Sequence, residues 1–179
     1  MSTSSFPPAP IDRFIAYSLH KLDDHFAQIA RCARLLSLDQ VWYRPNGHSN
    51  SVGNLLLHLR GNITQWLIGG LGGRPIERHR QGEFDHRDPI PAETLLAILR
   101  ATLDEAGMIV RAGGAAALDR AYTIQTYHVT GLEAVYHVVE HFAFHTGQIV
   151  TTTKWLLDCD LSIYDEKGHR RDGRKDAVP

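Results

Sequence analysis

The sequence predicts an all-α fold, a four-helix bundle formed by one domain. Three observations support this prediction. Four long segments carry apolar residues at helical spacing, glycine- or proline-containing stretches separate them, and only one short segment alternates as a strand does. With 179 residues, 43% of them hydrophobic, the chain is long enough to bury one core. Four striped segments in a chain of this size are typical of a four-helix bundle.

The first helix is predicted between Pro10 and the region 37–45, and the second between residues 49–51 and the glycine-rich stretch 69–73. Side chains at 49–51 can accept hydrogen bonds from the free amides of a first turn, and glycine tolerates the backbone that ends a helix. Apolar residues in the first helix alternate spacings of four and three, as in a helix packed nearly parallel or antiparallel to its neighbours. They are Ile15, Leu19, Leu22, Phe26, Ile29, Ala33 and Leu36.

A polar connection spans residues 74–90, between the second and third helices. It is longer than the loops of a bundle usually are, so we expect it either to cover an end of the fold or to be mobile. We expect its charged residues at 77–79 and 85–88 to be solvated.

The third helix is predicted to start at about Pro91, because proline is favourable in a first turn, and to end at Gly113–Gly114. Residues 122–129 are β-branched, aromatic and roughly alternating, which indicates a short extended segment. The fourth helix then runs from about Thr130 to Leu157. Its predicted core seam is Val135, Val139, Phe142, Thr146, Ile149, Thr153 and Leu156.

The predicted domain covers residues 11–165, with a flexible N-terminus at 1–10 and a loose charged tail at 166–179. Net charge is -1, and basic and acidic residues are interspersed, so nucleic acid is not an expected partner. No signal-peptide pattern and no membrane-spanning apolar run is present, and the two cysteines have no CxxC spacing. We therefore expect a soluble cytoplasmic protein without a membrane partner.

Three histidines carry the functional prediction. His141 and His145 are four residues apart on the fourth helix, so their imidazoles lie about 40° apart around its axis and can reach one point. His58 has a similarly apolar background on the second helix. Three imidazoles from two helices make a catalytic-type site for a divalent transition metal, with a position open to water or substrate. The alternative is that each is a half-buried histidine hydrogen-bonded to a neighbour.

Other polar residues near the histidines have supporting roles in this prediction. His137 extends the series, but its angular drift from His145 reaches about 80°, so we expect a packing or orienting residue rather than a ligand. A liganding imidazole usually donates its second N–H to an amide, carboxylate or carbonyl. Gln148 and Asn62 are the candidate orienting groups for the ligands or a substrate, and Asn54 and Gln65 are further candidates.

Residues 42–45, 50–58 and 137–148 resemble the DinB/YfiT-like superfamily, and the order of the helices extends the similarity over about residues 11–165. The resemblance implies a four-helix bundle with a three-histidine metal site, whose ligands fall on His58, His141 and His145. It also implies an activity. Characterised relatives include metal-dependent transferases and isomerases that use low-molecular-weight thiols such as bacillithiol, mycothiol or glutathione, and others are described as metal-dependent hydrolases.

The expected function is therefore that of a metal-dependent enzyme. Zinc or nickel is the expected cofactor, with manganese or iron as alternatives, and the bound ion would activate a low-molecular-weight thiol, as an S-transferase does, or water, as a hydrolase does. The partners expected are a small-molecule substrate and a second copy of the chain in a homodimer. A non-catalytic metal-binding or stress-associated bundle is the first alternative, and a helical interaction module without metal is the second.

Overall fold

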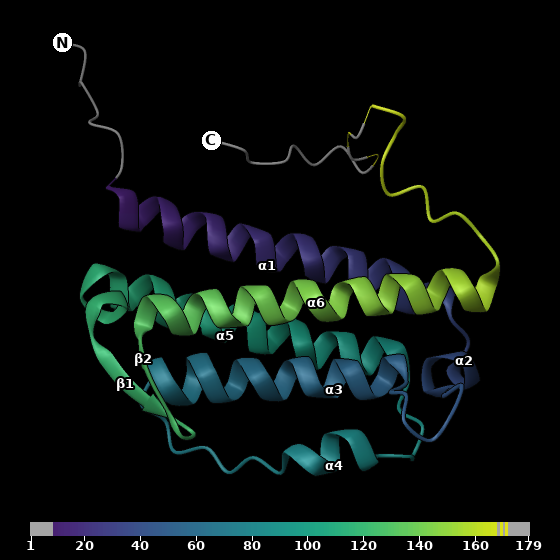
Figure 1. Ribbon diagram of the computed structural model, residues 1–179, viewed down its shortest axis with the longest axis horizontal. Helices are drawn as coiled ribbons and strands as arrows, with labels where there is room; N and C mark the ends of the chain where they lie inside the picture. The colour runs from purple at the N-terminus through teal and green to yellow at the C-terminus, as the bar shows by residue number, and fades with distance from the viewer. Residues whose placement is uncertain (1–8, 168, 170, 172–179) are drawn as a thin grey trace.

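The structure is a computed structural model that describes residues 9–167, 169 and 171. It confirms the mostly helical bundle. Four long helical segments run beside one another, with a hairpin at one end and a short helix at the other (Figure 1). The elements are α1 (Pro10–Leu35), α2 (Leu38–Trp42), α3 (Val52–Ile63), the π-helix η1 (Thr64–Leu71), α4 (Arg80–Asp85), α5 (Ala92–Asp119), β1 (Ala121–Ile124), β2 (Tyr127–Thr130) and α6 (Gly131–Leu157). Of the N-terminus expected to be flexible, residues 1–8 lie outside the described residues, and Pro10 is already the first residue of α1. Most of the expected tail also lies outside the described residues.

Local sequence fixes where three helices begin. In each, the residue before the helix accepts a hydrogen bond from the backbone three residues on, and that third residue bonds back to the cap. Such a reciprocal pair satisfies two amides that a first turn leaves free. The pairs are Ser37 with Gln40, Ser51 with Asn54, and Thr130 with Glu133. The last pair sets the start of α6 at the predicted position.

The core lies where α6 packs against α1, and along α5 and α3. The apolar side of α6 is fully buried at Val135, Val138, Phe142 and Ile149. Thr146 lies on the same side, and its hydroxyl donates to the Phe142 carbonyl at 2.7 Å, so its burial leaves no unpaired hydroxyl. Most of the predicted seam is confirmed.

The glycine-rich stretch behaves differently from the prediction in one respect. The helix does not stop at Gly69 but continues to Leu71 as η1, a π-helix. A side chain at Gly70 would overlap Ile124 of the hairpin, and one at Gly69 would overlap Ile76 of the connection. These glycines therefore allow the hairpin and the connection to pack closely against the helix, and they also lie just before the helix ends.

The segments after Pro91 follow the prediction with added detail. Gly114 has φ 53° and interrupts α5 where an end was predicted, and a short helical stretch follows it. The predicted extended segment, residues 122–129, is a hairpin of two strands: β1 and β2 pair antiparallel, with Ala121 opposite Thr130 and Ile124 opposite Tyr127. Among the described residues, no helix has the length and apolar character needed to cross a bilayer.

The connection 74–90 covers α3 along its side, on the edge of the bundle away from α1 (Figure 1). The Nδ2 group of Asn54 donates to the carbonyls of Glu83 and His86, and the indole of Trp42 donates to the Ile90 carbonyl. These bonds attach both α4 and the end of the connection to the bundle. The expectation that this segment's charges are solvated is wrong for Arg78, whose side chain is 7% exposed.

Candidate metal centre

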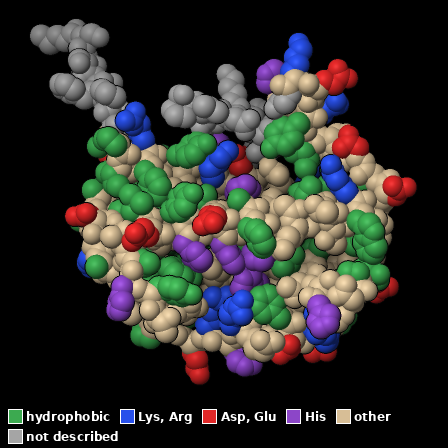
Figure 2. Space-filling view, in the orientation of Figure 1, with side chains coloured by type: hydrophobic (Ala, Val, Ile, Leu, Met, Phe, Trp, Pro, Cys, Tyr) green, Lys and Arg blue, Asp and Glu red, His purple; other side chains and the backbone are tan. Residues whose placement is uncertain are grey.

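The three predicted histidines meet between α3 and α6. One ring nitrogen from each of His58, His141 and His145 lies within 4.8 Å of the other two, an arrangement that could hold a metal ion. The Nε2 atoms of His58 and His141 are 2.9 Å apart. Figure 2 shows histidine side chains gathered in the middle of this face, with basic side chains below them. The structure therefore brings together all three residues that the helical spacing selected.

Burial favours the neutral form of two of these imidazoles, His141 and His145. His58 and His145 are only 4% and 8% exposed, and His141 is half-buried. Burial, followed by the neighbouring His145 and His58, lowers the pKa of His141 to about 3. Burial also lowers the pKa of His145, against the opposing effect of its hydrogen bond to Gln148. Neutral imidazole nitrogens offer the lone pairs that a transition metal requires.

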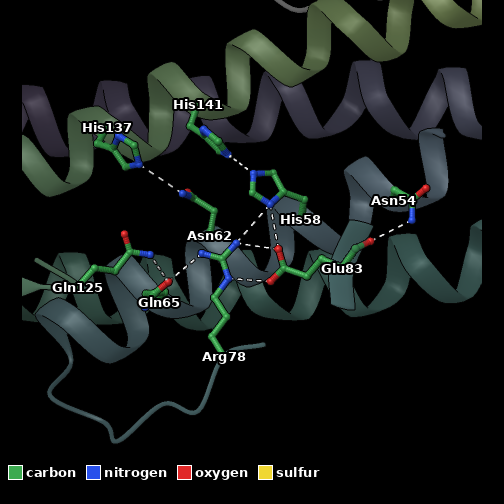
Figure 3. Close-up of polar contacts among 9 residues, drawn as sticks. All are labelled: Asn54, His58, Asn62, Gln65, Arg78, Glu83, Gln125, His137 and His141. Atoms are coloured by element: carbon green, nitrogen blue, oxygen red, sulfur yellow. Dashed lines mark hydrogen bonds and ion pairs between the residues drawn. The ribbon is translucent and has the colours of Figure 1, made fainter. Parts of the chain in front are cut away.

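A carboxylate and a guanidinium support His58 from the far side of its ring. His58 Nδ1 lies 2.9 Å from the Glu83 carboxylate, and Arg78 donates to both oxygens of Glu83, at 2.7 and 2.8 Å (Figure 3). Burial alone raises the pKa of Glu83, but the hydrogen bonds from Arg78 and His58 outweigh it and hold this pKa below its usual value. Glu83 is thus an anion that faces the imidazole.

This ionised carboxylate decides the tautomer of His58. Arg78 Nη2 is also 3.3 Å from His58 Nδ1, but an ionised Glu83 can only accept, and it is closer. The ring proton therefore lies on Nδ1, and Nε2 carries the lone pair that faces His141. A carboxylate that orients a histidine in this way is the usual partner of a liganding imidazole.

The Arg78–Glu83 pair fits against α3 because residue 61 is a glycine. A side-chain carbon at Gly61 would overlap the Glu83 carboxyl group and approach Arg78 Nε to 2.9 Å. Gly61 lies three residues after His58, on the turn of α3 that the pair crosses. The absence of a side chain at this position therefore gives the carboxylate its access to the imidazole.

Gln148 occupies the predicted orienting position for His145. Its Oε1 lies 2.7 Å from His145 Nδ1, so that nitrogen donates and Nε2 is left with the lone pair. The other candidate, Asn62, contacts His137 instead: its Nδ2 is 3.3 Å from His137 Nε2. Its Oδ1 is buried and has no hydrogen-bond partner among the described residues. His137 itself packs on the Trp66 ring, with centroids 4.1 Å apart, and is outside the three-histidine group as predicted.

The two remaining candidates act at a distance from the histidines. Asn54 accepts from the backbone of Ser51, the N-cap of α3, and its Nδ2 donates to the Glu83 carbonyl. Gln65 Oε1 accepts from Arg78 Nη1 at 2.9 Å and from Gln125 Nε2 at 2.7 Å (Figure 3). A continuous set of bonds therefore runs from the hairpin through Gln65 and Arg78 to Glu83.

Sequence reasoning missed Arg78 and Glu83. A liganding histidine generally needs a carbonyl or carboxylate partner, so a carboxylate near the predicted ligands was a reasonable expectation. Four acidic residues lie in the connection, however, and no spacing rule separates Glu83 from the other three, Glu77, Asp85 and Asp88. Only the path of the connection along α3 selects Glu83.

A hollow of about 430 Å³ opens on the histidines. His58 and His141 line it from the metal-ligand side, and Asn62, Trp66, Arg78 and Tyr127 line it from the other sides. This volume is in the usual range for a small-molecule site. We refer to it below as the metal-side hollow.

Comparison with known protein families relates the chain to one described superfamily. The model of the DinB superfamily matches residues 21–149, which is more than two thirds of the chain and includes all three histidines and Gln148. No curated protein matches the sequence.

Proposed function

The chain belongs to the DinB superfamily, and from this family and its three converging imidazoles we propose that it is a metal-dependent enzyme. His58, His141 and His145 are the proposed ligands of one divalent transition metal. The observation that carries the proposal is the convergence of three buried or half-buried ring nitrogens from two helices, with a carboxylate and an amide orienting two of the rings.

The donor geometry suits a tetrahedral ion. At a zinc–nitrogen distance of about 2.0–2.1 Å, ligand nitrogens in a tetrahedron are about 3.3 Å apart. The 2.9 Å separation of the His58 and His141 Nε2 atoms is slightly shorter, and every pair is within 4.8 Å. The three ligand atoms are thus close enough together to share one ion.

All-nitrogen donor sets bind zinc or nickel well, and manganese or iron are alternatives. A bound divalent ion lowers the pKa of a water molecule or thiol that it coordinates, which supplies a nucleophile at neutral pH. The chain's own residues do the positioning. Glu83 and Gln148 fix the rings of His58 and His145, and the metal-side hollow admits the reactant.

Asn62 is the residue proposed to contact the reactant. Asn62 lines the metal-side hollow, and its buried Oδ1 has no hydrogen-bond partner among the described residues. An S–H or O–H group beside the histidines would satisfy it, and leaving such an acceptor unpaired is unfavourable. We therefore assign Asn62 an orienting role toward the thiol or water, as S-transferase or hydrolase chemistry each requires.

Metal content of protein purified without a histidine tag tests the ligand assignment. We expect about one equivalent of a divalent metal in the wild type after reconstitution, and less than about a tenth of an equivalent in His141→Ala and His145→Ala. His137→Ala is the matched control and should retain the metal, because His137 is outside the three-histidine group. A wild type without metal would support the interaction-module alternative and end the proposal.

Turnover separates the enzyme from the non-catalytic metal-binding bundle. Low-molecular-weight thiols are screened with a model electrophile, and ester or amide hydrolysis is screened in parallel, for wild type and His145→Ala. Metal-dependent turnover of the wild type alone supports the enzyme. Equal rates, together with a lower melting temperature after chelation, would identify a metal that only stabilises the bundle. The homodimer stays a prediction, and the molar mass in solution tests it.

A further inference from the structure

A second and larger hollow adjoins the metal centre. It has a volume of about 710 Å³ and lies between the loop at residues 45–50 and the C-terminal half of α6. Phe144 and Trp155 stand at its mouth, 63% and 61% exposed, and Leu55 lies on its buried side. Large aromatic side chains left in solvent beside a hollow of this size are typical of a site for an apolar ligand. We refer to it as the aromatic hollow.

The two hollows differ in charge. The described residues that line the aromatic hollow include no lysine, arginine, aspartate or glutamate, although 22% of the chain is charged. Its polar groups are neutral amides, hydroxyls and one imidazole. The metal-side hollow, in contrast, is lined by Arg78, Arg80 and Glu133. A neutral ligand is therefore favoured in the first, because it brings no charge that would lose hydration without a partner.

The aromatic hollow touches the supports of the metal ligands on both helices. On α6, Gln148 lines it and holds the Nδ1 atom of His145 at 2.7 Å. On α3, Leu55 lines it and is one turn before His58. Residues three apart on a helix are neighbours on its surface, so this hollow ends beside His58 and His145. The histidines thus lie between the two hollows.

We propose that the aromatic hollow binds a neutral, apolar electrophile, which makes the protein a two-substrate transferase with one hollow for each reactant. This inference rests on the proposed function, and names its second substrate class. In the transfer, a lone pair on the thiol sulfur forms the new S–C bond. The bond between that carbon and its leaving group breaks, the leaving group departs with the electron pair, and the thiol proton passes to water.

Tryptophan fluorescence of the metal-loaded protein tests binding directly. Trp155 lines the aromatic hollow and Trp66 lines the metal-side hollow. The probes are nitrobenzene, which is neutral, and 4-nitrobenzoate, which is an anion of similar shape. We expect nitrobenzene to quench saturably, and Trp155→Phe to remove most of that signal while Trp66→Phe leaves it. Equal, unsaturable quenching by both probes would show random collision and overturn the inference.

A filled hollow supplies the second test. A Cβ at Gly147, which lines the aromatic hollow, would meet no atom within 4 Å, so Gly147→Leu adds bulk at the wall of the hollow without backbone overlap and removes a helix-destabilising glycine. It should weaken nitrobenzene binding by at least about tenfold. Ala143→Leu adds the same side chain to an exposed position of α6 that does not line this hollow, and should bind as wild type does. Unchanged binding in Gly147→Leu would contradict the inference.

Kinetics and metal content keep this inference separate from the proposed function. With a thiol and 1-chloro-2,4-dinitrobenzene, Gly147→Leu should raise the KM for the electrophile at least about fivefold and leave the KM for the thiol unchanged. If the protein binds metal and turns over, but Gly147→Leu does not raise the KM for the electrophile selectively, only the inference about the aromatic hollow is contradicted. A protein without metal or turnover would instead contradict the proposed function. Quenching that depends on protein concentration would assign the aromatic hollow to a second copy of the chain and also contradict the inference.

Discussion

Two neighbouring stripes of α6 perform different tasks although their residues alternate along one sequence: an apolar side with Val138, Phe142 and Ile149, and a polar side with His141 and His145. On the apolar side, Val138, Phe142 and Ile149 are fully buried, and apolar contacts inside the bundle are enough to hold them. Toward α3, His141 and His145 present nitrogens that need partners from elsewhere. The difference shows that stability and metal binding are encoded separately on one helix. Changes on one side should affect one property and spare the other.

The largest expected effect is on the apolar side. Phe142→Ala removes a fully buried ring and should lower the free energy of unfolding by about 3–5 kcal/mol. Chemical denaturation measures this loss, and the protein that remains folded should still bind about one equivalent of metal. A folded variant that has lost its metal would show that the two sides are not independent.

Acid should weaken the polar side in protein kept metal-free with a chelator. The pKa of His141 is about 3 in the folded protein against an ordinary value of 6.5, so below pH 6.5 the unfolded chain binds more protons than the folded one. The stability that this histidine contributes is therefore complete above pH 6.5 and is lost as the pH falls toward 3. Melting temperatures across this range measure the effect. His141→Ala should flatten the profile, and an unchanged profile would contradict this assignment.

A smaller effect is expected from the support of His58. Glu83→Gln removes the anion that orients its ring and should weaken metal affinity by about 10–100-fold, since orienting partners of ligands typically contribute this much. Competition with a chromophoric chelator measures the affinity. Glu77→Gln changes an exposed carboxylate of the same connection and should leave the affinity as in wild type. Equal affinities in both variants would remove Glu83 from the metal centre.

The smallest effect is expected from the N-cap of α6, which belongs to neither the apolar nor the polar side. Thr130→Ala removes the cap of α6 and should lower the free energy of unfolding by about 1 kcal/mol without changing metal content. Thermal unfolding and metal analysis of the same sample measure both quantities. A loss of metal in this variant would mean that the position of α6 along its axis is set mainly by its cap rather than by its packing.

Local patterns in the sequence predicted much of this molecule. Helical spacing predicts the four long helices, the convergence of His58 with His141 and His145, and the exclusion of His137, because these depend on rotation about a helix axis. The orienting role of Gln148 follows from the same rule, since it is one turn from His145.

The remainder depends on contacts between distant segments. Glu83 reaches His58 across 25 residues, and Gln125 reaches Gln65 across 60. No periodicity in the sequence records such pairs. The sequence also does not predict the π-helix η1. Its glycines have the composition that usually ends a helix, and their second role, close packing against Ile76 and Ile124, depends on contacts with other segments.

Gly61 has a consequence for efforts to make this protein more robust. Replacing a glycine inside a helix by alanine ordinarily stabilises the helix by about 1 kcal/mol, and a search for stabilising substitutions would select this position early. Here the added methyl group would displace the Glu83 carboxyl group and leave His58 without its orienting anion. The more stable variant would then be the poorer metal binder, so stability and metal binding are opposed at this position.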